Sequence, residues 1–178
     1  MLKEETVRQV MIKYFKSQNI EVIPQRGAGP DLHIKGKGVV EVKGSKYAFD
    51  RLLRQLADYA TKYNEVALAL PYDGLTLERI EQLHTLFFLT QRIDSELTIY
   101  VIAPTPEGNN SFYVQHFKRW DEVEVKMSAT MRIWGLDLKQ PASTIKNAVE
   151  NLIKYSPIEM LKDYVCMNAD NTTLKVQI

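Results

Sequence analysis

Two helix-like segments flank three strand-like segments in the first third of the chain. Apolar side chains recur at helical spacing over residues 3–18 and 46–63, which predicts two amphipathic helices. Residues 20–25 form a short strand candidate, and residues 31–35 and 39–43 alternate apolar and polar positions around a glycine-containing turn. That alternation is typical of a β-hairpin. The sequence therefore predicts the order helix, three strands, helix.

The next segments continue the alternation of helices and strands. A continuous apolar run at 66–70 is ended by Pro71 and predicts a central strand that is buried on both faces and parallel to a neighbour. This order predicts an α/β fold in which helices cover a sheet. The further elements that the patterns predict are a helix at 76–91, strands at 97–103 and 112–116, a helix at 144–155, a short helix from 156 and a terminal strand at 172–178.

The register of the predicted hairpin determines which side chains share a face. A three-residue turn at 36–38 pairs His33 with Glu41 and Asp31 with Lys43, so these four polar side chains lie on one face. A two-residue turn would mix apolar and polar side chains on both faces, so the hydrophobic pattern favours the three-residue turn. The apolar side chains of the hairpin then share the opposite face: Leu32, Ile34, Val40 and Val42.

The polar face of this hairpin is the strongest candidate for chemistry. The carboxylates of Asp31 and Glu41 repel each other there, and a hard divalent cation relieves that repulsion. Mg²⁺ favours such oxygen-rich, partly hydrated sites, and the backbone carbonyl of Val42 adds a candidate ligand. A metal ion can activate water and neutralise a transferring phosphate, while Lys43 supplies a fixed positive charge. The pattern thus predicts a Mg²⁺ site, in which Mn²⁺ substitutes, suited to phosphodiester hydrolysis.

The pair of motifs Pro30-Asp31 and Glu41-Val42-Lys43 resembles the signature of the PD-(D/E)xK nuclease superfamily. The predicted order of elements also matches that superfamily's core over residues 1–103. The resemblance implies a restriction-endonuclease-like mixed sheet with an α-β-β-β-α-β core, flanked by helices. It implies Asp31 and Glu41 as metal ligands and Lys43 as the catalytic lysine.

Two further features are similar to particular branches of this superfamily. Gln55 and Tyr59 match the Q-x-x-x-Y motif of RecB-type nucleases, and their spacing of four places them on one helix face. The N-terminal half is similar to archaeal Holliday junction resolvases, whose first-helix glutamate contacts the metal site. Glu4 lies about 60° from the buried direction of the first predicted helix and Glu5 about 160°. The resemblance therefore implies that Glu4 assists the metal site and that Gln55 and Tyr59 position the nucleic acid strand.

Composition narrows the class of protein without identifying the substrate. The chain has 178 residues, of which 45% are hydrophobic and 25% charged, as in ordinary globular proteins. Its length predicts one domain with an appendage, and the resemblance implies a nuclease-like domain at 1–118, followed by a C-terminal extension or small subdomain, helical and β, at 119–178. Cys166 is the only cysteine, which excludes an intrachain disulfide and a cysteine-cluster zinc site. The absence of an apolar span or signal-like N-terminus leads us to expect a cytoplasmic protein without a membrane partner.

The expected function is that of a Mg²⁺-dependent deoxyribonuclease whose partner is DNA. Junction, flap and free-end substrates all fit, as do endonuclease and exonuclease action and an RNA substrate. Net charge is only +1, so nucleic acid binding has to rest on a local basic patch. Enzymes of this superfamily often act as dimers, so the resemblance implies a homodimer. The alternative is a catalytically silent nucleic-acid-binding or assembly module on the same fold.

Two control expectations follow from the same residues. A second E-x-K triplet begins at Glu124 but has no Pro-Asp at hairpin distance before it, so we expect Glu124 to have no catalytic role. Repulsion between Asp31 and Glu41 predicts that Asp31→Asn slightly raises the melting temperature of the metal-free protein.

Overall fold

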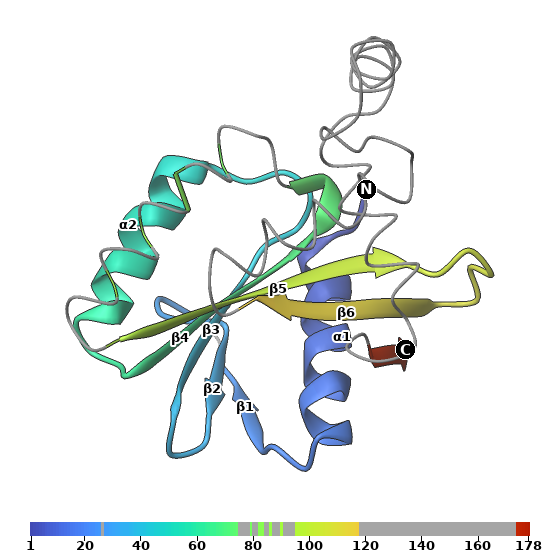
Figure 1. The fold of residues 1–178 in the computed structure, drawn as a ribbon, viewed down its shortest axis with the longest axis horizontal. Helices are drawn as coiled ribbons and strands as arrows, with labels where there is room; N and C mark the ends of the chain where they lie inside the picture. Colours follow the sequence, from blue (N-terminus) through green and yellow to red (C-terminus); the bar gives the residue numbers. More distant parts are fainter. Residues whose placement is uncertain are drawn as a thin grey trace, which may run out of the picture.

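One seven-stranded mixed sheet organises the described part of the protein (Figure 1). The computed structural model describes residues 1–25, 27–74, 95–117 and 174–178. It also describes five isolated positions, each of them helical: Arg79, Gln82, Leu83, Leu86 and Thr90. These five lie within the predicted helix 76–91. The predicted helices at 144–155 and from 156, together with Glu124, lie outside the described residues.

The described elements agree with the predicted ones to within a few residues at each end. The first half contains α1 (Glu4–Ser17), β1 (Val22–Pro24), β2 (Leu32–Ile34), β3 (Gly38–Val42), α2 (Phe49–Ala60) and β4 (Glu65–Pro71). A 3₁₀ turn, η1 (Tyr72–Gly74), follows, and the remaining strands are β5 (Glu96–Pro104), β6 (Ser111–Phe117) and β7 (Leu174–Gln177).

The sheet is parallel in its centre and antiparallel on both sides. Strands β3, β4 and β5 run parallel to one another, whereas β1–β2–β3 and β5–β6–β7 are antiparallel. The prediction that residues 66–70 form a buried, central, parallel strand is confirmed, since β4 is buried over its last six residues. Helix α2 provides the crossover from β3 to β4 that a parallel connection requires. The chain is therefore a mixed α/β protein, as predicted.

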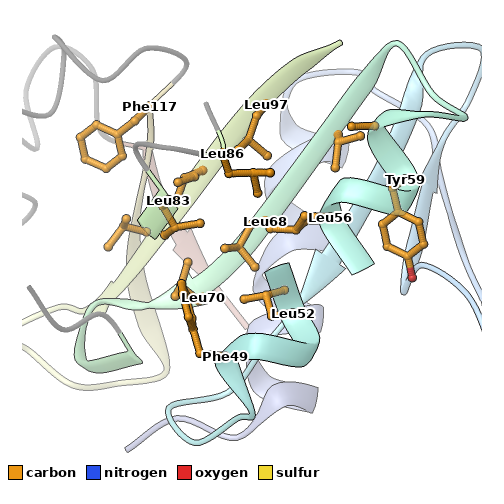
Figure 2. Close-up of a cluster of buried hydrophobic side chains, with 14 of the residues drawn as sticks. Phe49, Leu52, Leu56, Tyr59, Leu68, Leu70, Leu83, Leu86, Leu97 and Phe117 are labelled. Atoms are coloured by element: carbon orange, nitrogen blue, oxygen red, sulfur yellow. The ribbon is translucent and has the colours of Figure 1, made fainter. Parts of the chain in front are cut away.

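The two helices pack on opposite faces of the sheet and enclose two apolar cores. The buried stripe of α1, which includes Val7, Val10 and Met11, belongs to one core. The predicted apolar face of the hairpin belongs to this same core and is thereby confirmed. On the other face, Leu52 and Leu56 of α2 point toward β4, as Figure 2 shows. That figure also shows Tyr59 at the margin of the second core, with its hydroxyl pointing away from the cluster.

The hairpin register differs from the predicted one by two residues. His33 pairs with Val39 and Ile34 with Gly38, so the turn covers residues 35–37 instead of 36–38. Gly36 adopts the positive φ of +73° that the turn requires. Gly38 belongs inside β3, because a Cβ at this position would lie 2.0 Å from the carbonyl oxygen of Glu65 on β4. A shift of two residues leaves every side chain on its predicted face, since side chains in a strand alternate with period two.

The C-terminal strand belongs to the same sheet as the N-terminal half. Its residues pair with β6, and Val176 is buried in the core beneath α1. The predicted terminal strand is thus confirmed. No helix among the described residues is long and apolar enough to cross a membrane.

Candidate active site

Asp31 occupies the junction between two strands, immediately before β2. Its Oδ2 accepts a hydrogen bond from the backbone N–H of Val42 at 2.8 Å. Its Oδ1 accepts a second hydrogen bond, from the guanidinium of Arg8 on α1, at 2.9 Å. Only 16% of the side chain is exposed. Both carboxylate oxygens are therefore held in place by the protein, one by β3 and one by α1.

Glu41 lies on the face of β3 that α2 covers. Only 2% of its side chain is exposed, so the polar face predicted for the hairpin is covered at Glu41. The carboxylate forms an ion pair with Lys43 through Oε1 and accepts a hydrogen bond from the hydroxyl of Tyr59 at 3.2 Å through Oε2. Burial raises the pKa of Glu41, Lys43 opposes that increase, and the nearby negative charge of Asp31 adds to it. The two carboxylates are thus electrostatically coupled, as predicted from the sequence.

The α2 helix contributes Tyr59 and Gln55 to this arrangement. Burial raises the pKa of Tyr59 first of all, and the charge of Glu41 raises it further, while a hydrogen bond from Gln55 opposes both. The phenol therefore remains protonated at neutral pH and donates to Glu41. The predicted motif residues form a connected series, in which Gln55 contacts Tyr59 and Tyr59 contacts Glu41.

The first helix approaches the site through Arg8, which sequence analysis did not single out. One Nη atom of Arg8 lies 2.9 Å from Asp31 and 3.5 Å from Oε1 of Glu4. The other Nη lies 3.4 Å from Oε2 of Glu5. Glu4 is therefore joined to Asp31 by a guanidinium instead of facing the carboxylate pair directly. The spacing of four between Glu4 and Arg8 was the available signal, because such pairs share a helix face.

A close approach between the N-terminal segment and the end of β3 holds α1 in this position. Gly44 follows Lys43, and a Cβ on Gly44 would lie 2.9 Å from the backbone nitrogen of Glu4. The adjacent Ser45 forms two backbone-directed hydrogen bonds with Leu2, at 2.8 and 3.0 Å. The first turn of α1 therefore sits directly against the loop that carries the lysine.

The chemistry of the donor set fits Mg²⁺ or Mn²⁺. Asp31 and Glu41 provide carboxylate oxygens, which these hard cations prefer, and Mg²⁺ usually needs only one or two carboxylates because it keeps several water ligands. The carbonyl of Val42 adds a candidate ligand. In the described ranges, no group of three His, Cys, Asp or Glu side chains is arranged to hold a metal ion.

The site lies where the parallel strands end at their carboxyl termini, the usual place for ligand sites in α/β sheets. The structure brings together Asp31, Glu41, Lys43, Tyr59 and Gln55, and it connects Glu4 to them through Arg8. Comparisons of the chain with protein-family models, curated proteins and solved structures found no match.

Proposed function

We propose that the protein is a metal-dependent nuclease that hydrolyses phosphodiester bonds in DNA, built on the restriction-endonuclease-like fold. One observation supports this above all. A carboxylate with 2% exposure, Glu41, is held between a lysine and a tyrosine beside a second carboxylate, Asp31, at the end of a parallel strand. Burying a charge is costly, so such an arrangement is more typical of functional sites than of ordinary surfaces.

The order of elements adds support at the level of the fold. The chain passes through α1, β1, β2, β3, α2 and β4, which is the α-β-β-β-α-β order of the superfamily core. The Pro-Asp motif precedes β2 and the E-x-K motif ends β3, so both motifs stand in the expected structural context.

The residues of the site have distinct roles in this proposal. Asp31, Glu41 and the carbonyl of Val42 hold the metal ion, which when bound activates water and neutralises phosphate charge. Lys43, oriented by its ion pair with Glu41, stabilises the negative charge that develops on the phosphate oxygens. Tyr59 keeps the carboxylate of Glu41 in one orientation by donating a hydrogen bond, and Gln55 in turn orients Tyr59.

Cleavage of a DNA panel tests this proposal. Branched, duplex and single-stranded substrates are incubated with Mg²⁺, with Mn²⁺ and with a chelator. We expect cleavage of at least one substrate with either metal and none with chelator. Glu41→Gln and Lys43→Ala should abolish it, whereas the control Glu124→Ala should not. Glutamine is preferred at position 41 because it keeps the shape of a buried side chain. Unchanged cleavage in Glu41→Gln would contradict the assigned site.

A second candidate function, a non-catalytic module, is favoured by the hydrogen bonds and ion pairs that already occupy the two carboxylates. Every oxygen of Asp31 and Glu41 already has a protein partner, which is also the arrangement of a purely structural ion-pair network. A non-catalytic nucleic-acid-binding or assembly module would retain that network. It would bind DNA equally well with metal and with chelator, and it would cleave none of the panel.

A further inference from the structure

Arg8 carries one positive charge and lies close to three carboxylates. It donates a hydrogen bond of 2.9 Å to Asp31 and lies within 3.5 Å of both Glu4 and Glu5. Its side chain is 23% exposed, compared with 48% for Glu4 and 63% for Glu5. The strongest contact is therefore with the most buried of the three carboxylates, Asp31, and the two exposed ones stand on the solvent side.

The present position of the guanidinium leaves one of its donors unsatisfied. The Nε–H of Arg8 is buried and has no hydrogen-bond partner among the residues that the structure describes. An unpaired buried donor is destabilising, and this penalty is removed if the group moves toward water. Glu4 and Glu5 provide charged partners one turn or less from Arg8 on the same helix, so such a movement keeps the guanidinium paired.

The same guanidinium occupies the space next to a proposed metal ligand. A divalent cation at Asp31 would be repelled by a positive charge in contact with the same carboxylate. With Oδ2 bonded to Val42, the oxygen that Arg8 occupies is the one with greater freedom to bind a cation.

We propose that Arg8 is an exchangeable counter-ion of Asp31, which neutralises this carboxylate in the metal-free protein and moves to Glu4 and Glu5 when a divalent cation binds. Arg8 is thus a positioning residue that sets the affinity of the site. This inference rests on the proposed metal site and specifies how that site is kept stable without metal.

Calorimetric titration with Mn²⁺ and with Mg²⁺ tests the exchange in the full-length protein. Arg8→Gln removes the competing charge, so metal binding no longer has to break the charge-assisted hydrogen bond between Arg8 and Asp31. We therefore expect the Kd for either metal to fall about tenfold. Arg8→Lys keeps a competing charge and should bind metal with nearly the wild-type Kd. The matched control is Arg54→Gln, which removes the same charge from an exposed position on α2 and should leave the Kd unchanged.

The results separate this inference from the proposed function. If wild type binds neither metal, the metal site is refuted and the exchange with it. If wild type binds metal and Arg8→Gln binds it equally or more weakly, only the exchange is refuted, because Arg8 then supports Asp31 instead of competing for it.

A second measurement uses wild type and does not depend on the variants folding. Nitrogen-15 spectra of the arginine side chains report the Nε–H of Arg8 directly. In the metal-free protein we expect slow solvent exchange of this proton, because it is buried. Saturation with Mg²⁺ should shift the Nε–H signal of Arg8 and increase the rate at which this proton exchanges with solvent. The signal and the exchange rate of the Arg54 Nε–H should stay constant. An Arg8 signal unaffected by saturating Mg²⁺ would overturn the proposal.

Discussion

The substitution Asp31→Asn distinguishes two opposite views of the metal-free site. Sequence alone predicts a slightly higher melting temperature, because one of two repelling carboxylates is removed. The structure adds Arg8 and the backbone N–H of Val42, both of which bond to Asp31. We therefore expect the opposite sign, a lower melting temperature.

The magnitude follows from the bonds that asparagine can keep. Its single side-chain oxygen can accept from Val42 or from Arg8, so one charge-assisted hydrogen bond is lost, at a cost of about 1.5–3 kcal/mol. Removing the repulsion with Glu41 returns about 1 kcal/mol, close to the free energy of one pKa unit. The net loss of about 0.5–2 kcal/mol corresponds to a melting temperature lower by about 1–8 °C for a chain of this length.

Thermal unfolding in the presence of chelator measures this difference. A double-mutant cycle with Arg8→Gln isolates the contact, and we expect a coupling free energy of about 1–2 kcal/mol between the two positions. If Asp31→Asn melts at or above the wild-type temperature, the repulsion outweighs the ion pair and this account of the site is incorrect.

Three further predictions concern individual side chains. Tyr59→Phe and Gln55→Ala should each slow single-turnover cleavage about fivefold, as expected for the loss of one hydrogen bond near the metal, and should leave the calorimetric Kd for Mn²⁺ unchanged. Normal cleavage rates in both variants would show that the resemblance to RecB-type nucleases is superficial. Glu4→Gln should impair cleavage more than Glu5→Gln, and an equal or reversed effect would count against Glu4 as the residue that assists the metal site. Burial raises the pKa of Tyr47 to about 12, so its contribution to stability is complete below about pH 10 and is lost as pH rises toward 12. Urea unfolding at increasing alkaline pH should therefore show a weaker pH dependence for Tyr47→Phe than for wild type, and identical slopes would count against this assignment.

Local patterns were sufficient to predict the faces of the hairpin and the shared face of Asp31 and Glu41, whereas Tyr59 was assigned to the site through the resemblance of its motif. The period of two in a strand fixes which face a side chain takes, and the period of 3.6 in a helix fixes the buried stripe. The same period of two explains the error in register, since a shift by two residues preserves every face. The observed register places Gly38 inside β3 and against the backbone of β4, a tertiary contact that a hairpin pattern does not contain.

Sequence patterns did not predict the burial of Glu41 or the role of Arg8, because both depend on tertiary contacts. Whether α2 covers the polar face depends on where the helix packs on the sheet. The hydrophobic pattern of α2 identifies which side of the helix is buried, but it does not show which strands that side contacts. The contact between Arg8 and Asp31 joins two segments that no periodicity relates. Spacing within α1 links Arg8 only to Glu4 and Glu5.

The order of strands in the sheet has a consequence for how the molecule assembles. Each strand lies next to the one that precedes it in the chain, so most pairings form between nearby segments, which favours rapid folding. Among the described strands, β6 and β7 are the paired neighbours that lie farthest apart in the sequence, and the entropic cost of bringing two segments together grows with that separation. Strand β7 is therefore expected to dock last and to detach first. Its departure would expose the pairing edge of β6 that β7 covers, where the β7 of another molecule can pair in its place, so we expect strand exchange in concentrated samples.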